Sequence, residues 1–170
     1  MVLRGPYGAK ISYALRFGFG ASNNEAEYEA LVTALKLARH VGAEKVQIFL
    51  DSMLVVQQVK GEYEAKDEGM IEYLKLVRGL VIEFTSWSIN KILRAENCEA
   101  DRLSKYASIA VPSPEDQEER VFVEYLPKKT TSTPHVEMLD ISIGALKPSW
   151  MDPIMLLTSF LADGKLPSFM

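Results

Sequence analysis

Hydrophobic and polar positions follow two different periods along the first 110 residues. Residues 11–17 alternate with the two-residue period of a strand, and a Pro-Tyr-Gly turn at 6–8 separates them from a short apolar start. Residues 22–40 instead repeat apolar side chains every three or four positions, which is the spacing of one helix face. The pattern predicts a β-hairpin followed by an amphipathic helix.

Both ends of the predicted helix carry signals. Ser22 and Glu25 have the S-x-x-E spacing of a capping box, in which each side chain satisfies a free backbone N–H group. Gly42 is a typical helix stop. The short apolar run at 45–50 then indicates a buried strand reached by a crossover from a helix. We therefore expect a parallel strand at 45–50 and an α/β fold.

Periodic segments continue to about residue 110. Apolar spacing and cap residues predict helices at 53–59, 68–83 and 97–109, and a strand within 85–93. The next ten residues contain two prolines and four acidic side chains, which is typical of a linker.

These shifts in pattern predict three parts. Residues 1–110 form one domain. Residues 111–134 form an acidic and polar linker with a short strand at 121–126. Residues 135–170 form a connector tail in which apolar spacing predicts one amphipathic helix at 150–163.

Composition narrows the class of protein. The 170 residues are 48% hydrophobic with a net charge of −4, and the excess of acid lies after residue 110. No segment is a strongly basic nucleic-acid binder, so electrostatics alone would give weak affinity for phosphates. Cys98 is the only cysteine, which suits a reducing compartment. We see no membrane span and no secretory signal, and expect an intracellular protein.

Three acidic residues stand at unusual positions. Glu27 heads the apolar face of the first helix, Asp51 directly follows the strand at 45–50, and Asp101 lies in the first turn of the last helix. Each has an ordinary explanation: a carboxylate at the rim of the core, a helix cap, and a favourable helix dipole. Together, carboxylates gathered at one end of a sheet suggest hard divalent cations and two-metal phosphoryl chemistry.

The segments around these acids resemble a known family. SNNEAEYEAL, LDSMLVVQQVKGEYEAKD and ILRAENCEADRLSKYAS are similar to the ribonuclease H domain in the polyprotein of gypsy-type LTR retrotransposons, especially those of plants. The tail PSWMDPIMLLTSFLADGKLP resembles the connector to the zinc-binding and integrase part of such polyproteins.

The resemblance implies a fold and an activity. It implies a ribonuclease H-like fold, with a five-stranded mixed sheet and helices on both faces. It implies cleavage of the RNA strand of an RNA–DNA hybrid, with two Mg²⁺ (or Mn²⁺) ions held by four acids. Glu27, Asp51 and Asp101 match the second, third and fourth of these acids. Arg94 stands near the place where cellular members carry a histidine.

The resemblance also implies contacts to nucleic acid. Asn23, Asn24 and Ser52 are candidates for contacts to the 2′-hydroxyls and base edges of the hybrid's shallow groove. The two asparagines are also simply good residues for a helix start. The expected partner is an RNA–DNA hybrid or another nucleic acid, and not a membrane.

One family feature has no counterpart here. The family's first acid lies on its first, central strand, and this sequence has no Asp or Glu before Glu25. We expect that strand to be missing and activity to be lower by orders of magnitude. The hairpin then pairs directly with 45–50, or leaves strand edges unpaired, unless another segment such as 121–126 fills the gap. The alternative function is a non-catalytic remnant of a retrotransposon polyprotein that binds nucleic acid weakly.

Overall fold

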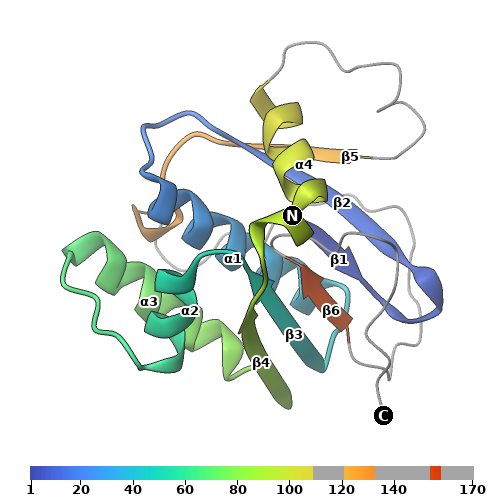
Figure 1. Ribbon diagram of the computed structural model, residues 1–170, viewed down its shortest axis with the longest axis horizontal. Helices are drawn as coiled ribbons and strands as arrows, with labels where there is room; N and C mark the ends of the chain where they lie inside the picture. Colours follow the sequence, from blue (N-terminus) through green and yellow to red (C-terminus); the bar gives the residue numbers. More distant parts are fainter. Residues whose placement is uncertain (109–120, 133–153, 158–170) are drawn as a thin grey trace.

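One mixed sheet organises the computed structural model, which describes residues 1–108, 121–132 and 154–157 (Figure 1). The strands are β1 Val2–Arg4, β2 Lys10–Phe17, β3 Lys45–Leu50, β4 Ser86–Lys91, β5 Val121–Leu126 and β6 Ile154–Leu157. The helices are α1 Asn23–His40, α2 Met53–Lys60, α3 Glu68–Val81 and α4 Cys98–Ser108, with short 3₁₀ turns η1 Pro6–Gly8, η2 Arg94–Glu96 and η4 Thr130–Ser132. The strand order is β4-β3-β6-β1-β2-β5.

The two predicted strand relations are present. β1 and β2 pair antiparallel across the η1 turn, with Val2 opposite Ser12. β3 and β4 pair parallel from Lys45–Ser86 to Leu50–Lys91. The α/β class and the mixed sheet are therefore confirmed.

The middle of the sheet differs from the expectation. β6 lies between β3 and β1, parallel to β3 with Val46 opposite Ile154, and antiparallel to β1 with Val2 opposite Leu157. The hairpin therefore does not pair directly with β3, and these edges are not left open. The reason is that β1 and β3 each present a row of backbone groups that needs a partner.

The segment predicted as a strand at 121–126 forms β5, but it does not fill that gap. β5 pairs parallel with β2 at the outer edge, from Ser12–Val121 to Phe17–Leu126. The gap is filled by Ile154–Leu157, where the sequence predicted part of a helix at 150–163. That expectation is wrong for these four residues, and the rest of 150–163 lies outside the described residues.

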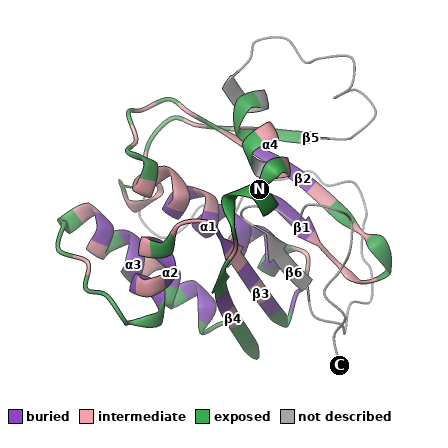
Figure 2. Ribbon diagram, viewed as in Figure 1, coloured by how far each residue is buried: buried purple, intermediate pink, exposed green. Residues whose placement is uncertain are grey.

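The core lies on both faces of the sheet. The larger cluster joins Ile48 and Leu50 of β3 and Leu3 of β1 to the buried sides of α1, α2 and α3. The smaller cluster joins Val2, from the other face of β1, to Leu103 of α4. Val2 and Leu3 are neighbours in β1 and therefore point to opposite faces of the sheet. Because each packs against a helix cluster, helices cover both faces, as expected. Figure 2 shows buried residues concentrated along α1, α3 and β3.

Three of the helices begin with a side-chain cap. Ser22 Oγ accepts from the Glu25 N–H at 3.3 Å, and the Glu25 carboxylate accepts from the Ser22 N–H at 2.8 Å, so the predicted capping box is present. Ser52 caps α2 through the Val55 N–H, and Asp67 caps α3 through the Met70 N–H. α2 then ends at Gly61, whose φ of 81° favours glycine.

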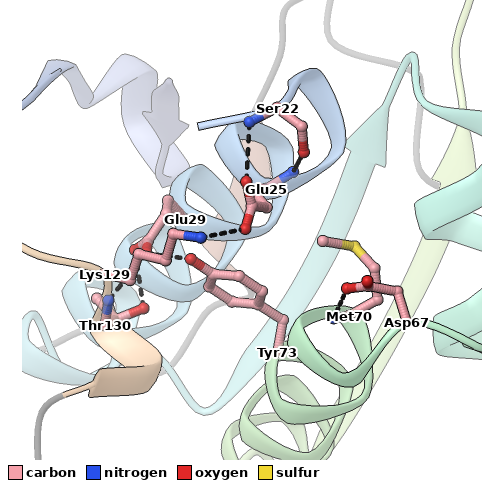
Figure 3. A network of polar contacts seen from close by, with 8 residues as sticks. All are labelled: Ser22, Glu25, Glu29, Asp67, Met70, Tyr73, Lys129 and Thr130. Atoms are coloured by element: carbon pink, nitrogen blue, oxygen red, sulfur yellow. Dashed lines mark hydrogen bonds and ion pairs between the residues drawn. The ribbon is translucent and has the colours of Figure 1, made fainter. Parts of the chain in front are cut away.

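The segment after β5 is held against α1 by carboxylates (Figure 3). Glu29 of α1 is completely buried and accepts from the Tyr73 hydroxyl at 2.5 Å, the Thr130 N–H at 2.8 Å and the Thr130 hydroxyl at 2.7 Å. One turn earlier, Glu25 forms an ion pair with Lys129. A buried carboxylate with three donors is well solvated by the protein, so this cluster joins η4 to α1 and α3.

Across the described residues, no helix is both long and apolar enough to cross a membrane.

Candidate active site

A cleft of about 470 Å³ opens where α1 begins, β3 ends and α4 begins. Its lining includes all six residues that the sequence predicted as site residues: Glu27, Asp51, Asp101, Asn23, Asn24 and Ser52. Apolar side chains of β2 form another part of its wall, among them Leu15 and Phe17. The structure therefore brings the predicted residues into one site, and their catalytic and binding roles remain predictions.

Local structure explains why Glu27 and Asp51 meet. Glu27 lies on the second turn of α1, whose start is fixed by the Ser22 cap. Asp51 is the first residue after β3, and Ser52 then begins α2. The carboxyl end of a buried parallel strand is where open α/β sheets place ligand sites. Both side chains are half-buried.

The carboxyl groups of Glu27 and Asp51 face the same cleft, and the charge of Asp51 acts on Glu27. Burial first and the charge of Asp51 second raise the pKa of Glu27, the positive charge of Arg94 opposes them, and the result is a pKa of about 7. Like charges this close favour one proton, or a cation, between them.

Asp101 lines the same cleft, but its carboxylate is more exposed and its partner is a lysine. Its carboxylate is exposed and forms an ion pair with Lys105 at 2.6 Å, one turn along α4. The hydrogen bond from Lys105 holds the pKa of Asp101 below its ordinary value. Across residues 1–108, 121–132 and 154–157, no group of three or more His, Cys, Asp or Glu side chains is placed to hold a metal ion. The predicted trio is thus a close pair with a third acid at the rim.

The chemistry of this donor set fits a divalent cation at the Glu27–Asp51 pair. Mg²⁺ and Mn²⁺ prefer carboxylate oxygens, and a cation between the two groups would remove the repulsion between their charges. Asp101 fits the same role only after it leaves Lys105. A cation and Lys105 would compete for the Asp101 carboxylate. The four-residue spacing of Asp101 and Lys105 on a helix predicts this ion pair from the sequence.

The cleft lining also includes Arg94 and Asn97, which the sequence did not predict as site residues. Arg94 belongs to η2, and its charge lowers the pKa of both Glu27 and Asp101. Asn97, just before α4, is buried and lines the cleft. The sequence indicated Asn97 only as a helix cap, and no pattern showed that its side chain faces the same cleft as the acids.

Comparisons with known proteins agree with this fold. The model of a family described as reverse transcriptase-like matches residues 1–107, and the chain belongs to that family. A ribonuclease HI of Halobacterium salinarum is 37% identical over 87 residues, which are 51% of this chain and 44% of that protein. A bifunctional protein of Mycobacterium tuberculosis is 33% identical over 87 residues, which are 51% of this chain and 24% of that protein. The chain spans less than half the length of these relatives.

Two solved structures have the same fold. The crystal structure of RNase H1 from Halobacterium salinarum matches with a TM-score of 0.56 and 33% identity, over 63% of this chain and 81% of that chain. The N-terminal RNase H domain of the Mycobacterium tuberculosis protein, solved as a fusion with maltose-binding protein, matches with a TM-score of 0.50 and 33% identity, over 51% of this chain and 63% of that chain. The described chain therefore contains a ribonuclease H-like domain.

Proposed function

We propose that this chain is a metal-dependent endonuclease that cleaves the RNA strand of an RNA–DNA hybrid by hydrolysis. The observation that carries the proposal is the pair of carboxyl groups, Glu27 and Asp51, in one cleft at the carboxyl end of β3. The similarity to proteins described as ribonuclease HI and RNase H1 supports the substrate class.

The roles follow from the arrangement of the cleft. Glu27 and Asp51 would hold the divalent cation, Mg²⁺ or Mn²⁺, and Asp101 would complete the ligands for a second ion. Such ions, when bound, supply Lewis acidity and a water of lowered pKa. Arg94 places a positive charge beside these carboxylates and can attract the phosphate backbone. The apolar side chains of β2 restrict water on one wall.

The residues that contact the nucleic acid in this proposal line the same cleft as the carboxylate pair. Asn23 and Asn24 begin α1, Ser52 begins α2, and all three line the cleft. Their side chains offer hydrogen bonds of both kinds at the mouth of the site, which suits a groove that displays 2′-hydroxyls and base edges.

We further propose that the chain derives from the polyprotein of a gypsy-type, plant-like LTR retrotransposon. The three motifs around Glu27, Asp51 and Asp101, and the connector-like tail, support this origin. A polyprotein source predicts that reverse transcriptase sequence precedes these residues in the genome and that integrase sequence follows. Sequencing of the flanking DNA tests it, and flanks without either would overturn it.

The activity is tested with purified chain and an RNA–DNA hybrid labelled on the RNA strand, in Mg²⁺ and in Mn²⁺. We expect slow cleavage of the RNA strand that stops in EDTA and in Asp51→Asn. Glu62→Gln, a change at an exposed carboxylate outside the cleft, is the matched control and should leave the rate unchanged. Absence of cleavage by the wild-type chain in both ions would overturn the proposed activity.

A second candidate is a domain that binds nucleic acid without cleaving it. The observation that favours it is the Asp101–Lys105 ion pair, which leaves two acids rather than three close together. It predicts hybrid binding that is equal in wild type and Asp51→Asn, and no product in either ion. Cleavage that disappears in Asp51→Asn would exclude it.

A further inference from the structure

The side chain of Asn97 has a buried acceptor that the described part of the chain does not satisfy. The residue is 6% exposed, and its Oδ1 atom has no hydrogen-bond partner there. A buried carbonyl oxygen without a donor is destabilising, and native proteins keep few of them. Such an atom indicates a partner that the described residues do not supply.

The position of Asn97 excludes the usual structural explanation. Its backbone N–H donates to the Arg94 carbonyl at 3.1 Å, and its own carbonyl accepts from the Asp101 N–H at 3.2 Å, so it lies at the start of α4. At this position an asparagine normally caps the helix through Oδ1. Ser22, Ser52 and Asp67 make that side-chain bond at the starts of α1, α2 and α3, whereas Asn97 Oδ1 does not.

The cleft itself is the place where a partner can reach Asn97. Asn97 lines it together with Arg94 and Asp101, on the wall formed by η2 and α4. The missing partner must be a hydrogen-bond donor, because Oδ1 only accepts. Phosphate oxygens are acceptors and cannot satisfy it. On a nucleic acid, the donor present at every residue of one strand, whatever its sequence, is the ribose 2′-hydroxyl.

We propose that Asn97 is a specificity-determining residue whose Oδ1 accepts a hydrogen bond from a ribose 2′-hydroxyl of the bound strand. The assignment rests on the proposed function and adds to it, because it names the wall of the cleft that distinguishes RNA from DNA. Asn97 then contributes to the preference for a hybrid over a DNA duplex. It contributes little to affinity for the phosphate backbone.

The test is binding in EDTA, where cleavage does not interfere, measured by fluorescence anisotropy with a hybrid and with a DNA duplex of the same sequence. We expect the wild-type chain to prefer the hybrid and Asn97→Ala to weaken hybrid binding about fivefold, with DNA binding unchanged. Asn90→Ala, on the exposed face of β4, is the control and should change neither. Equal weakening for both duplexes, or no preference in the wild-type chain, would overturn the assignment.

A second measurement separates this role from helix capping. Asn97→Ser keeps a short capping oxygen but withdraws the carbonyl from the cleft. We expect Asn97→Ser to unfold in urea at the wild-type midpoint and to lose the hybrid preference as Asn97→Ala does. Retained preference with lowered stability in Asn97→Ala would mean that Asn97 only caps α4. Cleavage of the hybrid by such variants would still stand, so failure here is distinct from failure of the proposed activity.

Discussion

Two carboxylate clusters lie two residues apart on the same helix, and their surroundings are opposite. Glu29 faces the interior, where the hydroxyls of Tyr73 and Thr130 and a backbone N–H satisfy it. Glu27 faces the cleft, which it shares with another carboxyl group, Asp51, whose charge raises its pKa. Both positions carry the same residue type on the first turns of α1.

The difference shows how a structural carboxylate differs from one that is proposed to be functional. Charge assistance and several donors make the Glu29 contacts strong, so its role is to join η4 and α3 to α1. Glu27 and Asp51 repel each other when both are ionised, which is one reason why the pKa of Glu27 is raised. Two carboxyl groups that share a cleft are typical of a site that binds a cation or a proton.

The largest expected effect is on the rate of hybrid cleavage, which should depend on Glu27 and not on Glu29. Glu27→Gln should lower the rate of hybrid cleavage at least about a hundredfold, because ligands of one metal site act as a unit. It should leave the urea midpoint equal to or above that of wild type, because a like-charge contact is removed. Single-turnover cleavage measures the rate, and urea unfolding measures the midpoint. Loss of stability without loss of activity would place Glu27 with the structural cluster.

The next effect is on stability alone. Tyr73→Phe removes one donor from the buried Glu29 carboxylate and should lower the free energy of unfolding by about 2 kcal/mol. The matched control is Tyr28→Phe. Tyr28 stacks on Tyr73 at 5.5 Å and donates to the neutral amide of Gln58, so its loss should cost about 1 kcal/mol. Both variants should cleave at the wild-type rate, and equal costs would mean that the Tyr73–Glu29 hydrogen bond is no stronger than the Tyr28–Gln58 hydrogen bond.

The third effect is a pH dependence of stability that comes from Glu27 in the cleft. The pKa of Glu27 is raised in the folded chain from 4.5 to about 7, so between these values the folded chain binds more protons than the unfolded chain. Stability from this group is therefore full below pH 4.5 and is lost as the pH rises through 7. Relative to Glu27→Gln, wild type should lose about 3 kcal/mol between pH 4.5 and 8 without metal. Urea unfolding of both proteins across this range tests it, and parallel profiles would contradict it.

Local signals predicted much of this arrangement. The capping box, the β3 run and the acid after it place Glu27 and Asp51 because each depends on a few neighbouring residues. The Glu29 contacts were not predictable, because Tyr73 is 44 residues away and Thr130 is 101 residues away. A helix face shows that a residue is buried but not which distant hydroxyl will meet it.

The same limit applies to the middle of the sheet. Ile154–Leu157 is a four-residue apolar run, which reads equally as helix or strand from its own sequence. Its conformation is decided by the unpaired backbone edges of β1 and β3, which lie far away along the chain. Asp101 was placed in the right cleft, but its ion pair with Lys105 was overlooked although the spacing was visible.

The smallest expected effect lies at the rim of the structural cluster. Lys129→Met removes the ion pair to Glu25, whose pKa the hydrogen bond from Lys129 lowers. Lys129 is partly exposed, so the loss of stability should be only about 0.5 kcal/mol, and smaller in high salt. Lys128→Met, at the exposed neighbouring position, is the matched control. A drop as large as that of Tyr73→Phe would mean that Lys129, and not the buried Glu29, is the main anchor of η4, and the contrast between the two clusters would then rest on the wrong carboxylate.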